Sequence, residues 1–338
     1  MPQGVFERFV LSSDIMTRRI SMAAAVAALV LGSGCEVSAQ NYPTRPLRVV
    51  VPYAAGGSTD VLARMVGQKL TEALGQPVVI DNRPGAGTLI ATEIVARAGP
   101  DGHTLLMATP PLAVAPALFQ KVPFDISRDF AAVTNIAATS NVLVVHPSMP
   151  AQTVKELVVL AKANPRKYTF GSSGIGGASH LAMELFRSMA GIELVHVPYK
   201  GGSLAVTDLL GGRLALMFAN LTTVQAHIKS GKVRALAIGT ARRSPVVPEL
   251  PTVAEAGVPG YEANNWNGVV VPAGTPRTAI ERLQREIKAI VSASDMRDKL
   301  LAAAFEPVAD TPAEFARYLA SERTKWAKVV IDAGVKPE

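Results

Sequence analysis

The sequence predicts an α/β protein made of two groups of βαβ units with a cleft between them. Two observations carry this prediction. From Pro46 onward, apolar runs bounded by Gly and Pro alternate with amphipathic helical patterns, as in parallel sheets covered by helices. Glycine-rich segments also recur where a strand-like run gives way to a helical pattern. With 338 residues, 49% of them hydrophobic, the chain can fill two cores.

The elements follow in order along the chain. Strand-like runs occupy residues 47–51, 77–81, 103–109, 141–146, 168–172, 193–197, 214–218, 233–239 and 268–272. Helical patterns occupy residues 59–74, 88–97, 153–163, 178–190, 203–211 and 222–230, and longer ones close the chain at 277–291, 295–304 and 312–333.

The closing helices have no strands of their own, so we expect them to return to the first sheet. This predicts a discontinuous first lobe, residues 43–141 plus 264–338, and a second lobe, residues 142–263. Two crossovers would then join the lobes. Ligands in such folds bind at the carboxyl ends of the strands, and domain interfaces favour pockets.

Residues 1–39 are predicted to be an export signal region. Arg18 and Arg19 precede an apolar stretch, residues 20–31, and a small-x-small cleavage pattern ends at Ala39. This order is typical of a signal peptide, and the stretch is too short for a stable membrane span. We therefore expect a periplasmic mature protein, whichever of Met1 and Met16 is the true start.

The alternative is lipid attachment at Cys35, because Gly32–Cys35 partly resembles a lipoprotein box. Cleavage after Ala39 would remove this cysteine, which is the only one in the chain. Disulfides, thiol catalysis and thiolate metal sites would then be excluded.

The charge pattern argues against nucleic-acid binding. The net charge is +7, but the Lys and Arg residues are scattered, without a basic run or interleaved aromatic residues. Dispersed positive charge is compatible with general attraction of small anions.

Four glycine-rich joints support a small-anion site: residues 53–60, 82–88, 171–180 and 198–203. Glycine permits close approach of the backbone to a ligand. The free N–H groups of the helical turn that follows suit a carboxylate. A single joint of this kind is compatible with a plain tight turn and a capped helix, whereas four across both lobes indicate a shared cleft.

Motifs for catalysis, metal binding and nucleotide binding are incomplete. Residues 171–179 lack the third glycine of a dinucleotide fingerprint, where Ser179 stands. Ile175 occupies the last position of a G-x-S-x-G elbow. The five histidines show no metal-ligand spacing, so no cofactor and no metal are expected. Of these, His180 is the one closest to a candidate site.

Several ordered stretches resemble the Bug family, the extracytoplasmic solute-binding receptors of tripartite tricarboxylate transporters. They include PYAAGGSTD, DNRPGAGT, GSSGIGGASHLAMELF and HVPYKGGS, and the similarity runs from about Tyr42 to the C-terminus. The resemblance implies a type II periplasmic-binding-protein fold that closes on a small carboxylate. It also implies membrane transporter subunits as partners, and a monomer that is not an enzyme.

By position, the resemblance implies contacts from both lobes. In the first lobe they are Tyr53, Ala54, Gly57, Ser58, Asp60, Gly85, Gly87 and Thr109. In the second lobe they are Ser172, Ser173, Gly174, Gly176, Ser179, His180, Tyr199, Lys200, Gly201 and Ala219.

Three departures from the family pattern make the expected cleft less polar. Pro110-Pro111-Leu112 follows Thr109 where polar residues are usual, Ile175 lies within the serine loop, and Ala219 replaces a frequent acid. They favour a ligand with one carboxylate and an apolar or aromatic part. Ordinary drift at positions that do not face the ligand is the alternative.

Two further functions stay open at this point. The same fold can serve as a sensor that presents its ligand to a membrane receptor kinase. A periplasmic hydrolase would need a nucleophile and a base in contact, and no such arrangement stands out in the sequence.

Overall fold

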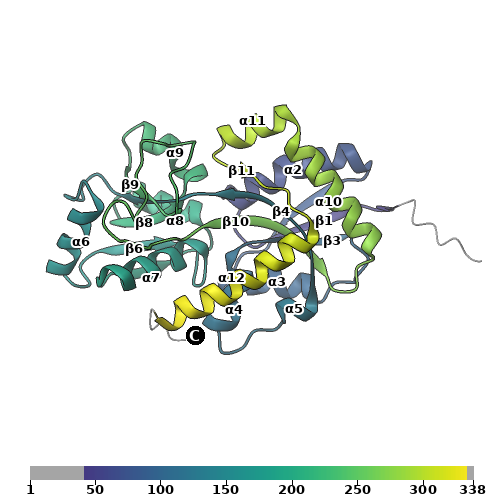
Figure 1. Cartoon of the computed structure of the whole chain (residues 1–338), viewed down its shortest axis with the longest axis horizontal. Coiled ribbons are helices and arrows are strands. Elements are labelled where there is room, and N and C mark those ends of the chain that lie inside the picture. Colours follow the sequence, from purple (N-terminus) through teal and green to yellow (C-terminus); the bar gives the residue numbers. More distant parts are fainter. Residues whose placement is uncertain (1–41, 333–338) are drawn as a thin grey trace, which may run out of the picture. The chain divides into compact units, whose positions relative to one another are not determined.

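The computed structural model describes residues 42–332, and residues 43–338 form one compact unit. The predicted export signal region and Cys35 lie outside the described residues. The unit contains a six-stranded sheet and a five-stranded sheet, both covered by helices (Figure 1). Within the described residues no helix has the length and apolar character needed to cross a membrane.

The first sheet has the strand order β11-β4-β10-β3-β1-β2. Its strands are β1 (Leu47–Val51), β2 (Val78–Asn82), β3 (Thr104–Ala108), β4 (Phe130–Thr139), β10 (Asn265–Pro272) and β11 (Glu306–Pro307). Strand β1 pairs in parallel with β2 and β3, whereas β10 runs antiparallel between β3 and β4.

The second sheet has the strand order β7-β6-β8-β5-β9. Its strands are β5 (Asn141–Val145), β6 (Thr169–Ser172), β7 (Val195–Pro198), β8 (Leu216–Asn220) and β9 (Arg234–Ile238). Strand β6 pairs in parallel with β7 and β8, and β5 runs antiparallel to β8 and β9. Each sheet thus combines a parallel part with an antiparallel strand that begins at a crossover between the two sheets.

The helices connect and cover these strands. They are α2 (Ser58–Leu74), the short 3₁₀ helix η1 (Ala86–Thr88), α3 (Leu89–Ala96), α4 (Pro110–Leu118), α5 (Ile126–Asp129), α6 (Val154–Ala163), α7 (Ala178–Ala190), α8 (Gly202–Leu210), α9 (Leu221–Lys229), α10 (Arg277–Ser292), α11 (Ser294–Ala302) and α12 (Pro312–Asp332). A buried stripe with a spacing of four residues explains α10: it consists of Ala279, Leu283, Ile287 and Val291.

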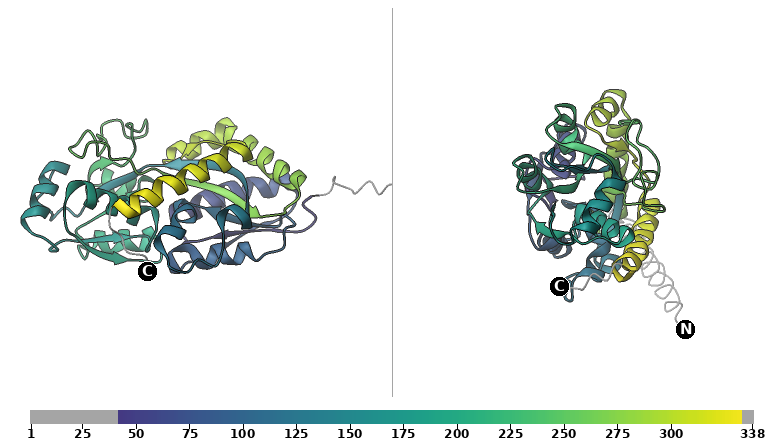
Figure 2. Two further views of the ribbon diagram at one scale, coloured as in Figure 1. Left: turned by 60° about the horizontal axis from the view of Figure 1, so that its bottom comes forward. Right: turned by 90° about the vertical axis from the view of Figure 1, so that its left-hand side faces the viewer.

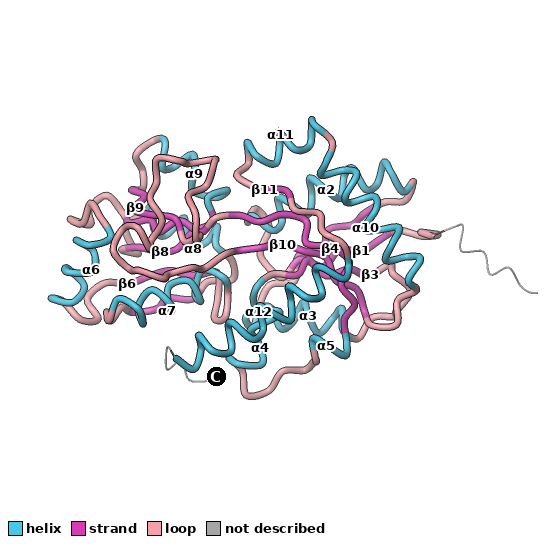
Figure 3. Tube along the Cα trace, viewed as in Figure 1, coloured by secondary structure: helices cyan, strands magenta, loops and turns pink. Residues whose placement is uncertain are grey.

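The sequence prediction is correct for most elements and misses a few. The ten-residue strand β4 was not predicted, because its segment FAAVTNIAAT mixes alanines with polar residues and shows no clear period. The helices α4 and α5, the 3₁₀ helix η1 and the two-residue β11 were also missed. The expectation of parallel sheets is wrong for β5 and β10, which run antiparallel to their neighbours. Figure 3 shows the strands of both sheets in magenta.

Helix α12 packs against the cores of both sheets. Phe315 and Leu319 join the apolar cluster that contains Val50 of β1. About two to three turns further along, Trp326 and Val330 join the cluster that contains Phe170 of β6. Figure 2 shows the helix, in yellow, extending between these two regions.

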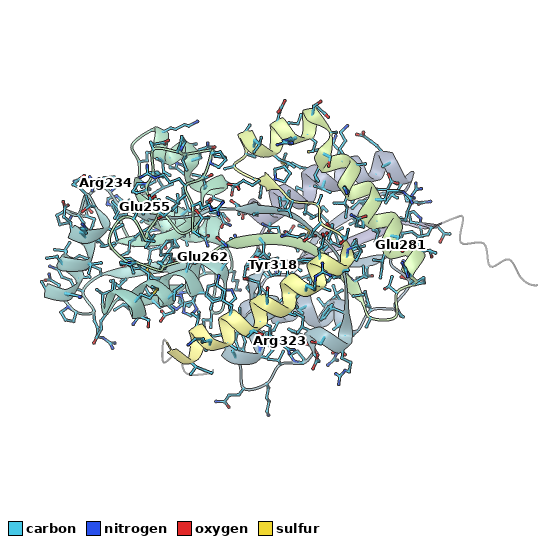
Figure 4. All side chains as sticks on the ribbon, viewed as in Figure 1. Arg234, Glu255, Glu262, Glu281, Tyr318 and Arg323 are labelled. Atoms are coloured by element: carbon cyan, nitrogen blue, oxygen red, sulfur yellow. The ribbon has the colours of Figure 1, made fainter. Side chains whose placement is uncertain are left out.

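A buried carboxylate links the two cores along this helix. Glu322 Oε2 accepts hydrogen bonds of 3.0 Å from both Trp266 Nε1 and Trp326 Nε1. Tyr318 packs edge-on against the Trp266 ring, with centroids 5.9 Å apart, and is labelled on α12 in Figure 4. The helix is thus fixed by specific bonds as well as by apolar packing.

Candidate ligand-binding site

A small space, which we call the central cavity, lies between residues of the two sheets. Its volume is about 40 Å³. The first-sheet side contributes Tyr53, Gly57, Ser58, Thr59 and Thr109, and Asn265 lies at the start of β10. The second-sheet side contributes Ser173, Ala178, Ser179, Gly202, Met217, Phe218, Ala219, Asn220 and Thr223. No lining residue carries a formal charge.

Four helices begin at this cavity. The N-cap residues of α2, α7, α8 and α9 are Gly57, Gly177, Gly201 and Asn220, and none of them caps its helix through a side chain. The first-turn N–H groups of a helix have no acceptor within the helix, and they carry partial positive charge. Their convergence favours an anion in a space that has no cationic side chain.

A fifth helix, α4, begins after Thr109 but contributes differently. Its first two residues are Pro110 and Pro111, which have no N–H group. Both are buried, and neither lines the central cavity. The two prolines therefore remove two amide donors from the end of the cavity near Thr109.

Hydrogen bonds cross the cleft on two sides of the cavity. Asn220 Nδ2 donates to Ser58 Oγ, and Asn265 Nδ2 donates to Asn220 Oδ1 over 2.7 Å. Elsewhere Ala54 N donates to the carbonyl oxygen of Lys200 over 3.2 Å. These bonds hold the two sets of helix N-termini around one space.

Several main-chain amides of the serine loop, residues 172–179, are bonded within the loop or to His180, which follows it. Ser173 N donates to Ser179 Oγ (2.8 Å), Gly174 N to Ser172 Oγ (3.2 Å), and Gly176 N to His180 Nδ1 (3.2 Å). What this loop can offer a ligand is therefore the first turn of α7 and its hydroxyl groups.

Two stacked histidines support the serine loop. The rings of His180 and His196 lie 4.2 Å apart, and the Phe170 ring stacks on His196 at 4.7 Å. Burial lowers the pKa of His180 to about 3 and that of His196 to about 4. Both rings are neutral at physiological pH, so His180 Nδ1 can accept the hydrogen bond from Gly176.

A serine–histidine pair that the sequence analysis did not identify is also present here. Ser172 Oγ lies 2.6 Å from His196 Nε2. Ser172 is fully buried, and neither residue lines the central cavity. The pair therefore serves the loop's own hydrogen-bond network.

A second space, which we call the side chamber, adjoins the central cavity at Tyr53 and Ser173, which line both. Its volume is about 280 Å³. Its other lining residues are Pro52, Gly85, Ala86, Gly87, Thr88, Phe119, Gly174, Ile175, Pro198, Tyr199 and Lys200. Burial raises the pKa of Tyr53 to about 12, and its hydroxyl lies 3.2 Å from Thr109 Oγ1.

The structure brings most of the sequence-predicted site residues to these two spaces. Tyr53, Gly57, Ser58, Thr109, Ser173, Ser179 and Ala219 line the central cavity. Gly85, Gly87, Gly174, Tyr199 and Lys200 line the side chamber, together with Tyr53 and Ser173. The remaining predicted residues line neither space and lie around the two spaces instead: Ala54, Asp60, Ser172, Gly176, His180 and Gly201. For all of the predicted site residues, the role as a ligand contact stays a prediction.

Asp60 shows what such a surrounding residue does. Its carboxylate accepts hydrogen bonds from Gly56 N (2.9 Å), Asn82 Nδ2 (3.0 Å) and Arg64 Nε (3.0 Å). Burial raises its pKa, but these bonds outweigh burial and the pKa lies below the ordinary value. The carboxylate thus fixes the turn that leads into α2.

Sequence reasoning missed several lining residues: Thr59, Ala178, Gly202, Met217, Phe218, Thr223, Asn220 and Asn265. The first three are neighbours of predicted residues in helical first turns, so the joints themselves were the available signal. Asn265 has no local signal, because β10 reaches the cavity only through its pairing with β4.

Two α/β sheets with a cavity between them are the architecture of periplasmic binding proteins, and comparisons with known proteins agree. A model of the tripartite tricarboxylate transporter family receptor matches residues 62–335. The chain belongs to this family.

Relatives and solved structures support the assignment over most of the chain. Protein BugT of Bordetella pertussis is 38% identical over 307 residues, which cover 90% of this chain and 94% of BugT. The structure of R. palustris Rpa4515 with adipate has a TM-score of 0.85 at 38% identity and covers 88% of this chain and 100% of its own. MatC from Rhodopseudomonas palustris with bound malate has a TM-score of 0.82 at 30% identity and covers 86% and 100%.

Proposed function

We propose that this protein binds a small carboxylate in the central cavity and delivers it to the membrane subunits of a tripartite transporter. One observation supports this proposal most strongly. Four helices without side-chain N-caps begin at the central cavity, and no residue that lines this cavity is charged. Family membership supports the proposal, as do the similar structures solved with adipate and malate.

The cavity can hold an anion without a cationic side chain. Main-chain N–H groups and the Ser58 hydroxyl are available donors, and they need little reorganisation when a carboxylate arrives. The Ser173 and Ser179 hydroxyls share a hydrogen bond of 3.0 Å, so one of the two is left to donate. Helix dipoles add attraction of about 0.3–1 kcal/mol each near a terminus. Binding here is therefore strongest when both lobes present their helices together.

The proposal describes a binding protein and not an enzyme. Catalysis of hydrolysis would need a nucleophile that contacts both the ligand and a general base. Ser172, the serine that is bonded to His196, is fully buried away from the cavity. Turnover of an ester or amide substrate by the purified protein would overturn this part of the proposal.

The division into lobes, residues 43–141 plus 264–338 and 142–263, is part of the proposal. Strand β4 ends at Thr139 and β5 begins at Asn141, while β9 ends at Ile238 and β10 begins at Asn265. Closure about these two connections brings α2 toward α7, α8 and α9.

We further propose that the protein is a periplasmic monomer, released from its signal after Ala39. Light scattering on the purified protein gives the mass of the particle. Mass spectrometry of the N-terminal peptide distinguishes cleavage after Ala39 from a lipid-bearing Cys35.

A thermal-shift screen of carboxylic acids tests the central claim. The panel includes acetate, succinate, malate, adipate, citrate, benzoate and phenylacetate. A bound acid at a hundredfold excess over its Kd raises the stability by about 2.7 kcal/mol. The proposal fails if no acid shifts the unfolding temperature and calorimetry detects no binding.

A further inference from the structure

We propose that the ligand is an acid with one carboxylate in the central cavity and an aromatic body in the side chamber. This inference rests on the proposed function and names the class of acid. It follows from the size of the central cavity and the chemistry of the spaces around it.

The central cavity is too small for a whole metabolite. A buried water needs at least about 10–15 Å³, so a cavity of about 40 Å³ holds about three non-hydrogen atoms, as in one carboxylate group. The rest of the ligand must therefore extend into an adjoining space. The side chamber of about 280 Å³ adjoins at Tyr53 and Ser173.

The side chamber offers mainly apolar and aromatic surface. Phe119 and Ile175 line it from opposite lobes, together with Pro52 and Pro198. No carboxylate lines the chamber, and the exposed Lys200 is its single charged lining residue. Such a lining favours the body of an aromatic ring over a second strongly hydrated group.

Two tyrosines are held in place before a ligand arrives. The Tyr53 hydroxyl oxygen lies 3.2 Å from Thr109 Oγ1. Tyr199 donates to Asp208 Oδ2 over 2.6 Å, and Arg213 Nη1 in turn donates to Asp208 Oδ1 over 2.7 Å. Side chains fixed in this way lose little entropy when an aromatic ring packs against them.

The backbone that lines the chamber is fixed in an uncommon conformation. Ala86 and Thr88 have φ values of +45° and +83°, in the region that non-glycine residues rarely adopt. Strain of this kind persists only where surrounding structure holds it, and it concentrates at binding and active sites.

Another space adjoins the central cavity at Ser58 and Thr223 and has a volume of about 310 Å³. Its lining includes Ser203, Thr207, Thr222 and His227. At the boundary, Asn220 Nδ2 is bonded to Ser58, and Thr223 Oγ1 donates to Asn220 O over 2.8 Å. This polar, hydrogen-bonded boundary suits solvent better than an aromatic ring.

Calorimetry with four acids and the purified protein tests the inference. Acetate and phenylacetate share a carboxylate and differ by the ring, whereas succinate and citrate add carboxylates. We expect phenylacetate to bind roughly 10- to 100-fold more tightly than acetate, the effect of burying a ring. We also expect it to bind more tightly than succinate or citrate.

Three variants locate the ring. Tyr199→Ala should weaken phenylacetate binding about tenfold, and Tyr199→Phe, which keeps the ring, should retain most of the affinity. Leu210→Ala alters the lining of the other adjoining space and should leave phenylacetate binding unchanged. Acetate binding should be the same in all three variants.

Distinct results separate the inference from the proposed function. Tighter binding of succinate or citrate than phenylacetate overturns the inference and leaves the proposed function intact. A loss in Leu210→Ala without a loss in Tyr199→Ala places the ligand in the other space and also overturns it. If none of the acids binds, both proposals fall. The comparison of wild-type affinities stands even if a variant does not fold.

Discussion

Asn220 and Ser58 connect the two sheets beside the central cavity: Asn220 Nδ2 donates a hydrogen bond to Ser58 Oγ. Asn220 is the last residue of β8, and Ser58 is the first residue of α2. The bond leaves the Ser58 hydroxyl hydrogen free to donate in turn. It forms only when α2 and α9 approach each other, so it belongs to the closed arrangement of the lobes.

We expect Asn220→Ala to weaken binding of the tightest acid in the carboxylate panel by about fivefold to tenfold. The variant loses both cross-cleft bonds of Asn220, to Ser58 Oγ and from Asn265 Nδ2, at about 0.5 kcal/mol each, the lower end of the range for one hydrogen bond. Isothermal calorimetry measures it. Asn164→Ala is the matched control, because Asn164 Nδ2 donates only to Leu160 O at the end of α6. Equal affinities of wild type and Asn220→Ala would contradict the closing role.

Gly87→Ala should weaken acid binding about tenfold by opposing closure. A Cβ atom at Gly87 would lie 2.5 Å from the carbonyl oxygen of Ile175 in the opposite lobe. Backbone atoms cannot give way as a flexible side chain does. The Cβ atom would also lie 2.6 Å from Phe119 Cζ in its own lobe, but this is the end of a side chain that can turn aside. The contact with Ile175 forms only when the lobes are closed, so the unliganded open form should be less affected than the closed form.

Gly75→Ala is the control for the backbone strain of this substitution. Gly75 has φ +68°, close to the +58° of Gly87, and a Cβ atom there meets nothing within 4 Å. Both variants should lose about 1 kcal/mol of unfolding free energy. A tenfold loss of affinity in Gly75→Ala as well would show that strain, and not closure, is responsible.

Stability should fall as the pH is lowered from about 6.5 to about 4, because His180 and His196 are buried as neutral rings. Burial lowers their pKa values to about 3 and about 4, below the unfolded value of 6.5. In this window the unfolded chain binds more protons, so the free energy of unfolding decreases on acidification. For His180 the slope is up to about 1.4 kcal/mol per pH unit.

Urea unfolding at about pH 7, 6 and 5 measures this slope. His180→Gln removes one titrating group and should flatten the curve. Glu184, 3.7 Å from His180 Nε2, and the nearby Arg187 also face this pair. An unchanged slope in the variant would assign the pH dependence to other groups.

Glu322→Leu should destabilise the protein by about 2–4 kcal/mol, since it leaves two buried indole N–H groups without an acceptor. The carboxylate accepts from Trp266 and Trp326 and is 4% exposed. Glu322→Gln keeps an acceptor oxygen and should lose less. Thermal unfolding followed by circular dichroism gives the order of the two stability losses. A smaller loss for Glu322→Leu than for Glu322→Gln would be inconsistent with this account.

The sequence was sufficient to predict the elements that have a clear hydrophobic period or that are bounded by Gly and Pro. Strand β1 is found at its predicted residues, 47–51, and the helices α2, α7 and α10 lie close to their predicted ranges. Strand β4 is different. Its alanines and polar residues become buried through pairing with β10 and packing of α12, which local patterns do not reveal.

The candidate site likewise contains residues that the sequence could predict and residues that it could not. Glycine-rich joints identified Gly57, Ser173 and Ser179, because turn chemistry and helix starts are local properties. Asn265 comes to the cavity from a distant part of the chain, so only the tertiary fold reveals it. Of the three departures from the family pattern, Ala219 lines the central cavity, Ile175 lines the side chamber, and the Pro110–Leu112 segment lines neither.

The shared carboxylate of Glu322 has a practical consequence for the study of this protein. The chain contains only two tryptophans, and both donate to this one acceptor where α12 passes from one core to the other. Tryptophan fluorescence therefore reports from a single place in the molecule. A change in tryptophan emission on addition of an acid would report movement at that place, and no attached dye is needed.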